Sequence, residues 1–280
     1  MSATTVVKVL SWLSAEVLVM GCGALFSQIT FNYHMIDGLI YPPQIDKGIC
    51  YNMNQDQLKK MVGEAARDEV LKLASGQVLG IGTGSTVNCF IDALAPYKAH
   101  FSGTVSSSNA TTERLLKHGF KVLNPNDVNG LPAYVDGADE IDSLGNMIKG
   151  GGGALTREKI IASMAKQFIC ICDSSKQVSV LGAFALPVEI IPLAQGVVTR
   201  ELEKFGWKVS LRLAKSAQEP FVTDNGGWIL DVAGLSISNP LSMESQINQI
   251  AGVITVGLFA KERANILLVS NTAGVVRLIL

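Results

Sequence analysis

Short apolar segments alternate with amphipathic segments from residue 54 onward, and this alternation constrains the fold more than any other feature of the chain. Apolar residues recur at helical spacing over residues 56–73, and the apolar run at 78–81 then leads into the glycine-rich stretch GTGST. Four more apolar runs follow, with helical patterns between them, at residues 101–106, 120–124, 131–142 and 167–173. Short strands that alternate with helices predict a Rossmann-like α/β fold with a doubly wound parallel sheet.

The alternation changes after residue 183. A helical pattern at 196–206, two strand patterns at 207–213 and 221–232, and a second helical pattern at 243–252 predict a smaller α+β module. The final residues return to short apolar strands that could rejoin the main sheet. We therefore expect a Rossmann-like catalytic domain of residues 53–183 and 257–280, with a small α+β domain of residues 184–256 inserted near the C-terminus.

The first 52 residues differ from the rest, since residues 17–35 carry no formal charge. A transmembrane helix, a signal peptide and a lipoprotein cleavage site before Cys22 are three alternatives for this stretch. Polar residues interrupt the apolar run, only one basic residue precedes it, and Met20 is unusual in a lipoprotein site. We favour an extension without a fold of its own, upstream of a helical domain that begins at Met53.

The composition excludes several classes of protein. With 48% hydrophobic and 17% charged residues among 280, the chain is globular, and its net charge of −1 without a basic stripe argues against a nucleic-acid binder. None of the five cysteines forms a CxxC pair, which indicates reduced thiols in a cytosol. The three histidines are too scattered for a structural zinc site.

Four turns at the ends of predicted strands carry residues suited to a ligand, and in open α/β sheets ligands bind at this edge. The first, GTGST at residues 82–86, places small residues before a helix, where backbone N–H groups and hydroxyls can hold an anion. It lacks the lysine of a Walker A loop and the last glycine of GxGxxG. A tight turn without a ligand is the alternative. The second, SSSN at 106–109, is explained by helix capping alone.

The third turn, DGADE at residues 136–140, gathers three carboxylates. Clustered carboxylates repel one another unless water, a cation, a lysine or substrate hydroxyls satisfy them. A solvated acidic loop, a magnesium site and a site for sugar hydroxyls are all open interpretations.

The fourth turn, KGGGG at residues 149–153, precedes a helical pattern that contains Glu158. Glycine is costly to order, so four in a row indicate that something approaches the backbone closely. A base for proton abstraction from carbon must be a carboxylate or a histidine, and no histidine lies in these turns. Glu158 is therefore the leading candidate, although a first-turn glutamate could simply complement the helix dipole. Lys176, which follows the fifth predicted strand, is a fifth and weaker candidate for the ligand site. Its alternative is a surface lysine without a ligand.

Together these stretches resemble ribose-5-phosphate isomerase of the A type. The resemblance covers about residues 53–280, and its eight blocks occur in order and with matching spacing. The matching blocks are GIGTGST at 80–86, SSSNATTE at 106–113, YVDGADEID at 134–142, KGGGGALTREKI at 149–160, CDSSKQV at 172–178, LPVEIIP at 186–192, VTDNGGWILD at 222–231 and GVITVGLFA at 252–260. Residues 1–52 have no counterpart in the family pattern.

The resemblance implies an aldose–ketose isomerase of the pentose phosphate pathway that interconverts D-ribose 5-phosphate and D-ribulose 5-phosphate through a cis-enediol, without a cofactor or a metal. It implies that Glu158 is the base, that Asp136 and Lys149 assist ring opening and stabilise the enediolate, and that Asp139 binds hydroxyls. The implied substrate site consists of Thr83, Gly84, Ser85, Thr86, Asp136, Gly137, Ala138, Asp139, Lys149, Gly150, Gly151, Gly152 and Lys176. Lys59 or Lys60 could also reach a phosphate.

The resemblance further implies a cytoplasmic homodimer or homotetramer whose partner is a small sugar phosphate, with neither nucleic acid nor membrane involved. Three rival hypotheses stay open at this point. They are an isomerase of another pentose or tetrose phosphate, a sugar-phosphate-binding regulator that needs no base, and a magnesium-dependent phosphoryl-transfer enzyme that uses Asp136 and Asp139.

Overall fold

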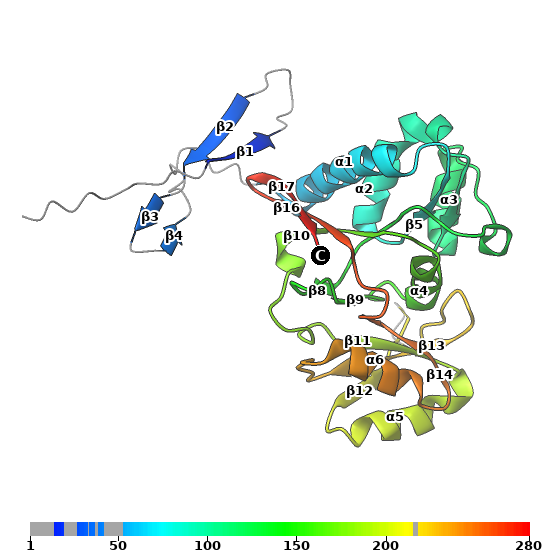
Figure 1. The fold of residues 1–280 in the computed structure, drawn as a ribbon. Coiled ribbons are helices and arrows are strands. Elements are labelled where there is room, and N and C mark those ends of the chain that lie inside the picture. Colours follow the sequence, from blue (N-terminus) through cyan, green and yellow to red (C-terminus); the bar gives the residue numbers. More distant parts are fainter. Residues whose placement is uncertain (1–13, 20–26, 33, 37–38, 42–52, 215–217) are drawn as a thin grey trace, which may run out of the picture. The chain divides into compact units, whose positions relative to one another are not determined.

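The computed structural model describes residues 14–19, 27–32, 34–36, 39–41, 53–214 and 218–280 (Figure 1). The chain divides into two compact units, residues 1–52 and residues 53–280. In the first unit, β1 (Ser14–Val19) pairs antiparallel with β2 (Ser27–Asn32), and β3 (His34–Ile36) pairs antiparallel with β4 (Leu39–Tyr41). Cys22, where a lipoprotein site would lie, is outside the described residues, and no helix within them is long and apolar enough to cross a membrane. That residues 1–52 lack a fold of their own stays a prediction.

The second unit is built on a six-stranded sheet, and the predicted doubly wound architecture is confirmed. The strands are β5 (Val78–Ile81), β6 (Gly103–Ser106), β7 (Tyr134–Asp136), β10 (Phe168–Asp173), β16 (Ile266–Asn271) and β17 (Gly274–Ile279), in the order β17-β16-β10-β7-β5-β6. All neighbours are parallel except β16 and β17. Because β5 lies between β6 and β7, the chain changes direction across the sheet there, and this is where an open α/β sheet binds its ligand.

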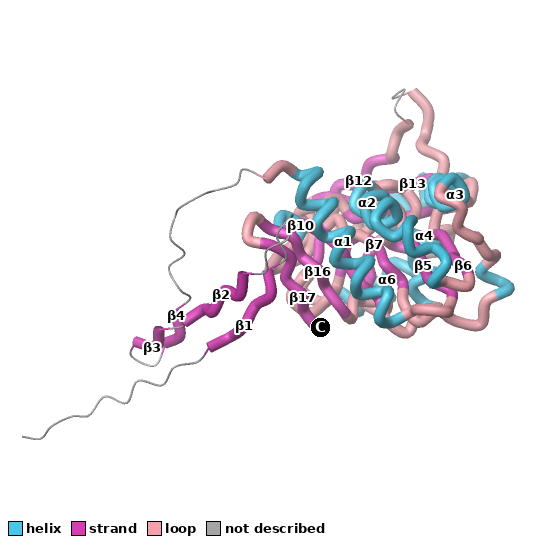
Figure 2. The backbone as a smooth tube through the Cα atoms, turned by 90° about the horizontal axis from the view of Figure 1, so that it is seen from above, coloured by secondary structure: helices cyan, strands magenta, loops and turns pink. Residues whose placement is uncertain are grey.

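Helices cover both faces of this sheet. α1 (Gln55–Leu73), which begins at a capping box on Asn54, and α2 (Ser85–Leu94) pack on one face (Figure 2). Their apolar side chains meet those of the strands there. α4 (Leu155–Ser163) contributes Ile161 and Ala162 to the core on the other face. α3 (Asn109–Lys117) follows β6 and is capped by Ser108. Short 3₁₀ helices occupy Ala95–His100, Pro125–Asp127, Ser174–Lys176 and Pro192–Ala194.

A separate antiparallel sheet forms the smaller α+β part of this unit. Its strands are β11 (Leu186–Ile190), β12 (Lys208–Leu211), β13 (Trp228–Ala233) and β14 (Val253–Val256), in the order β12-β13-β11-β14, and α5 (Gln195–Glu203) and α6 (Pro240–Asn248) cover it. We call this part the small domain; its boundaries at 184 and 256 stay predictions. A third sheet joins β8 (Glu140–Ile141), β9 (Met147–Ile148) and β15 (Leu258–Phe259). α4 lies against the small domain (Figure 1).

Three expectations about strands are wrong. The strand predicted over residues 221–232 begins only at Trp228, because the chain turns before it, where the Gly226 N–H donates to the Thr223 carbonyl oxygen at 3.0 Å. Residues 120–124 form only one bridge, between Val122 and Thr104, because Gly119 at φ +76° and Pro125 limit the segment and Leu123 packs over Gly103. The strand predicted through residues 131–142 is interrupted after Asp136, since the chain turns there toward a cavity before β8 begins.

Candidate active site

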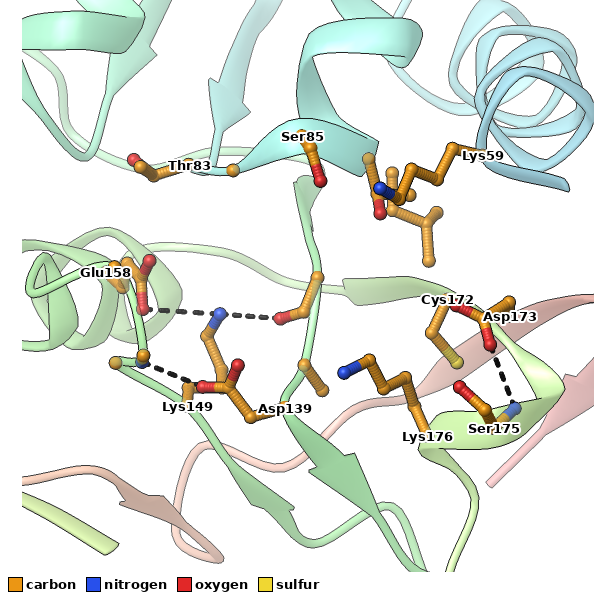
Figure 3. A pocket seen from close by; sticks show the side chains of 18 of the residues that line it. Lys59, Thr83, Ser85, Asp139, Lys149, Glu158, Cys172, Asp173, Ser175 and Lys176 are labelled. Carbon is orange, nitrogen blue, oxygen red and sulfur yellow. Dashed lines mark hydrogen bonds and ion pairs between the residues drawn. The ribbon is translucent and has the colours of Figure 1, made fainter. Parts of the chain in front are cut away.

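A cavity of about 440 Å³ lies at the carboxyl ends of β5, β7 and β10, where the chain changes direction across the sheet (Figure 3). The turns after these three strands and the glycine run before α4 form its wall. The lining includes Glu158 and, of the thirteen residues expected in the substrate site, all but Asp136, namely Thr83, Gly84, Ser85, Thr86, Gly137, Ala138, Asp139, Lys149, Gly150, Gly151, Gly152 and Lys176. The fold thus brings together turns that lie up to 93 residues apart in the sequence, from residue 83 to residue 176.

Lys149 is the centre of a buried charge cluster. Its Nζ lies 2.8 Å from Asp136 Oδ2 and 3.3 Å from Glu158 Oε2, and it donates to the carbonyl oxygen of Gly137 at 2.6 Å. The side chains of all three charged residues are at most 5% exposed. Burial by itself would lower the pKa of Lys149, but the negative charges of Asp136 and Glu158 outweigh this effect and raise it above its ordinary value. Lys149 is therefore a permanent cation at the cavity wall.

Asp136 is held on every side by donors. Its Oδ1 accepts the backbone N–H groups of Thr83 and Gly137 at 3.0 and 2.8 Å, and its Oδ2 accepts the Tyr134 hydroxyl at 2.5 Å. Gly82 is required here, because a Cβ at this position would lie 2.1 Å from Asp136 Oδ1. Burial and the Asp136 charge raise the pKa of Tyr134 well above its ordinary value, so Tyr134 keeps its proton and donates a hydrogen bond to the carboxylate at all ordinary pH values. Asp136 is thus a fixed counter-ion for Lys149.

Glu158 is the least satisfied member of the cluster. It lies in the first turn of α4, is 4% exposed, and its Oε2 accepts no hydrogen bond from the described residues although Lys149 is 3.3 Å away. Burial raises the pKa of Glu158 to about 8; the Lys149 charge opposes this shift and the Asp136 charge adds to it. A carboxyl group that gains and loses its proton near neutral pH at a cavity wall is suited to general acid–base catalysis.

The four glycines have different tasks. Gly151 admits the carboxylate of Asp139, whose Oδ2 accepts the Gly151 N–H at 2.8 Å and whose Oδ1 would be 2.7 Å from a Cβ there. Gly150 and Gly152 line the cavity, and nothing lies within 4 Å of a Cβ placed on Gly152. Gly153 does not line the cavity: it has φ +84°, and Phe221 fills the place of a side chain. Three of the four glycines thus line the cavity, but only Gly152 leaves open space where a side chain would stand, since Leu155 and Asp139 occupy those positions at Gly150 and Gly151.

The GTGST turn leads into α2, and its residues 83–86 line the cavity at a helix N-terminus, which favours an anion. The Thr83 hydroxyl is engaged by the hydroxyls of Ser107, Ser108 and Thr111 at 2.9, 2.9 and 3.2 Å. The serine cluster at 106–108 thus caps α3, as expected. It also supports the GTGST turn through Thr83, and this second role was not apparent from the sequence.

Six further residues line the cavity without having been assigned to it: Gln55, Lys59, Ile171, Cys172, Asp173 and Ser175. Lys59, which was left without a firm role, reaches the cavity from α1, whereas Lys60 is not among the lining residues. Asp173 accepts the Ser175 N–H at 2.9 Å and so orders the short helix that carries Lys176. In the view of Figure 3, Glu158 and Lys149 lie to one side and Lys59 and Lys176 to the other.

Among the described residues, no group of three or more histidine, cysteine, aspartate or glutamate side chains could hold a metal ion. The acidic turn explains why: the Asp136 oxygens are used by backbone, tyrosine and lysine donors, and one oxygen of Asp139 is used by Gly151. Of the three interpretations of this turn, these contacts fit the site for sugar hydroxyls best, since they hold the carboxylates in place at the wall of a polar cavity.

Comparison with known proteins finds ribose 5-phosphate isomerase A both by sequence and by structure. A family model described as ribose 5-phosphate isomerase A (phosphoriboisomerase A) matches residues 103–274. Ribose-5-phosphate isomerase A of Polynucleobacter asymbioticus is 82% identical over 236 residues, covering 81% of this chain and 100% of the relative.

Solved structures agree over the same share of the chain. Ribose 5-phosphate isomerase A from Neisseria gonorrhoeae is 42% identical with a TM-score of 0.76, covering 81% of this chain and 97% of its own. A D-ribose-5-phosphate isomerase in complex with phospho-erythronic acid is 36% identical with a TM-score of 0.76, covering 81% of this chain and 100% of its own.

Proposed function

Since the chain belongs to the ribose 5-phosphate isomerase A family and interconverts D-ribose 5-phosphate and D-ribulose 5-phosphate, we propose that Glu158 is the base that moves the proton between C1 and C2. The observation that carries this proposal is the state of its carboxylate, which is buried at the cavity wall, accepts no hydrogen bond at Oε2 and has a pKa raised to about 8 by burial. A base needs a free oxygen and a pKa near the working pH.

The proposed reaction conserves atoms and electrons without an external oxidant. Starting from the open-chain aldose, Glu158 removes the proton from C2, and the electron pair forms the C1–C2 double bond while the C1 carbonyl oxygen gains a proton. This gives a cis-enediol. Glu158 then returns the proton to C1, and the C2 hydroxyl loses its proton to become the ketone. One carboxylate thus serves both half-reactions, as base and then as acid.

Lys149 and Asp136 supply the electrostatic part of this mechanism. Negative charge develops on the oxygens bound to C1 and C2, and Lys149 is a buried cation 3.3 Å from the base. Asp136 keeps Lys149 charged and fixed, and both assist opening of the sugar ring. Asp139 accepts hydrogen bonds from sugar hydroxyls with Oδ1, the oxygen that the Gly151 N–H does not use.

The GTGST turn, Lys176 and Lys59 bind the phosphate in this proposal. The N-terminus of α2 and two lysines put positive charge at the cavity wall, and ammonium groups and backbone N–H groups are common phosphate ligands. The complex of a relative with phospho-erythronic acid supports a phosphate-bearing ligand.

We also propose a cytoplasmic homodimer or homotetramer. The free thiols of Cys89, Cys170 and Cys172 support a reducing compartment such as the cytoplasm. Light scattering on the purified full chain would measure the oligomeric state.

The test of this function is the isomerisation of ribose 5-phosphate in the presence of EDTA, with wild type compared with Glu158→Gln. We expect the wild type to turn over and the variant to lose about 10²- to 10⁴-fold in kcat, the usual contribution of a general base, with substrate binding largely kept. A sugar-phosphate regulator would show no turnover in either protein, and a magnesium-dependent enzyme would stop in EDTA. Full activity of Glu158→Gln would contradict the role of Glu158.

A further inference from the structure

The position of the Glu158 carboxylate is not fixed by its own hydrogen bonds. Lys149 is the only basic side chain among the described residues that lies within 4 Å of it, and Oε2 accepts no hydrogen bond. The helix that carries it, α4, has no side-chain cap at its N-terminus. The placement of this carboxylate therefore depends on what holds the first turn of α4.

The residue two positions before the base is held by Glu189 of β11. The hydroxyl of Thr156 donates to Glu189 Oε2, while Glu189 Oε1 accepts the Thr223 hydroxyl at 2.6 Å and the Asn225 amide at 3.2 Å. Glu189 is completely buried, and no lysine, arginine or histidine of the described residues pairs with it. A buried carboxylate without a cation depends on such hydrogen bonds, so this one is a rigid support for the start of α4.

The residue before the base is held by the same loop of the small domain. Arg157 donates from Nε to Asn225 Oδ1 at 2.8 Å and from Nη2 to the Asp224 carbonyl oxygen at 2.7 Å. Its Nη1 also donates to Asn109 Oδ1 at 2.9 Å, and the Asn109 N–H donates to Asp224 Oδ2 at 2.8 Å. Residues 223–225 thus join the start of α4 to the start of α3.

The residue after the base is held by α6 and β15. Lys159 Nζ donates to Glu244 Oε1 at 2.5 Å and to the Leu258 carbonyl oxygen at 2.7 Å, and it lies 4.7 Å from the centre of the Phe259 ring. Glu244 is itself fixed, because its Oε2 accepts the N–H groups of Ala260 and Lys261 at 2.9 and 2.8 Å. Three of the four residues from 156 to 159 are therefore anchored outside the main sheet, and the fourth is Glu158.

We propose that the small domain positions the base, with Glu189 as the positioning residue at the start of α4 and Lys159 as the second anchor. Asp136 ends β7 of the main sheet and lies 2.8 Å from Lys149, which itself follows β9 and donates its backbone N–H to the Gly257 carbonyl oxygen at 2.8 Å. The place of the base relative to this ion pair therefore depends on how the small domain holds α4. The proposal rests on Glu158 being the base. It predicts that loss of an anchor lowers catalysis while leaving substrate binding intact.

Thr156→Val tests the first anchor, because valine keeps the shape of threonine and removes the hydroxyl that reaches Glu189. Thr156→Ser keeps the hydroxyl and serves as the conservative variant. Thr104→Val in β6 is the matched control: it removes a buried hydroxyl, bonded to the Lys121 carbonyl oxygen at 3.2 Å, away from the cavity. We expect Thr156→Val to lower kcat about 10- to 100-fold with KM changed by less than about threefold, since a misplacement near 1 Å can cost about 100-fold. Thr156→Ser and Thr104→Val should keep kcat.

The pH profile of kcat/KM separates positioning from loss of stability. Lys149 lowers the pKa of Glu158, whereas burial and the charges of Asp136 and Asp139 raise it. A base that moves away from Lys149 should therefore titrate at higher pH, and the acidic limb of Thr156→Val should shift upward. Lys159→Met tests the second anchor in the same way and keeps the proposal testable if Thr156→Val folds poorly. Thr104→Val should leave the limb in place.

The double variant Thr156→Val/Glu158→Gln distinguishes failure of this proposal from failure of the proposed function. If Thr156 acts through the base, its loss should have no further effect on the residual rate of Glu158→Gln. Unchanged kcat and pH limb in both Thr156→Val and Lys159→Met would overturn the positioning role, whatever their melting temperatures. An active Glu158→Gln would instead overturn the assignment of the base.

Discussion

Glu158 lies in the first turn of α4 and Glu189 contacts that turn through Thr156, but the surroundings of these two buried glutamates are opposite. Glu158 faces a cavity, has a cation 3.3 Å away and accepts no hydrogen bond at Oε2 from the described residues. Glu189 lies in the core of the small domain, where three side-chain donors satisfy it without a cation. The same side chain is thus left reactive in one place and made rigid in the other. The number of donors around the carboxylate, more than its burial, separates the two cases.

Among the substitutions that test this comparison, removal of the Lys149 cation should have the largest effect on stability and on kcat. Lys149→Met would leave Asp136 and Glu158 as two buried carboxylates without a positive partner, so we expect a loss of about 3–5 kcal/mol in the free energy of unfolding and at least about 100-fold in kcat. Urea denaturation and steady-state kinetics measure the two quantities. Lys176→Met is the control for stability, because this cavity lysine is half-buried and forms no ion pair with the described residues. Equal losses of stability in both variants would contradict a special role for the Lys149 cluster.

The pH dependence of the free energy of unfolding should distinguish the two glutamates directly. The folded-state pKa of Glu158, about 8, is above its ordinary value of 4.5, so its contribution to stability is present below pH 4.5 and is lost as the pH rises through 8. Glu158→Gln should therefore be more stable than wild type at pH 9, by a few kcal/mol at about 1.4 kcal/mol per pKa unit, and similar near pH 4.5.

Glu189→Gln is the counterpart, since a neutral amide weakens three hydrogen bonds to a charged acceptor. We expect it to lower stability by about 1–3 kcal/mol at both pH values. Thermal or urea unfolding of both variants at the two pH values makes the comparison. Destabilisation of Glu158→Gln at pH 9 would show that its carboxylate is held by more than Lys149.

A smaller effect is expected in the pH dependence of kcat/KM. The base must be ionised in the free enzyme, so kcat/KM should fall about tenfold per pH unit below the pKa of Glu158, near pH 8. Glu189→Gln should retain such an acidic limb, and the residual activity of Glu158→Gln should lack it. A flat profile from pH 6 to 9 in wild type would mean that another group, or a step other than proton transfer, controls the rate.

Several features were predictable from the sequence because they depend on local pattern. Apolar runs of strand length, separated by helical periodicity, predicted the doubly wound sheet, and the glycine-rich and acidic turns predicted the edge at which the cavity lies. The need for a carboxylate or histidine base pointed to Glu158, and that role stays a proposal. The false strand at residues 120–124 shows the limit of this reasoning, because a β-branched apolar run next to an edge strand need not extend the ladder.

Two features of the site had no local signal. The role of Ser107 and Ser108 in holding Thr83 depends on packing between β5 and β6, although their sequence explains only a helix cap. Glu189 in LPVEIIP lies 31 residues beyond Glu158, and nothing in either stretch indicates that they serve the same helical turn.

The sequence by itself determined the fold class and the residue types of the cavity, because periodicity and turn chemistry act over neighbouring residues, and the family followed from the resemblance of its motif blocks. Only the tertiary structure decided which carboxylate is free and which is saturated. That difference depends on the donors that residues 156, 223 and 225 bring to Glu189, on the cation of Lys149 beside Glu158, and on exclusion of water, all of which exist only after the two sheets have packed around α4.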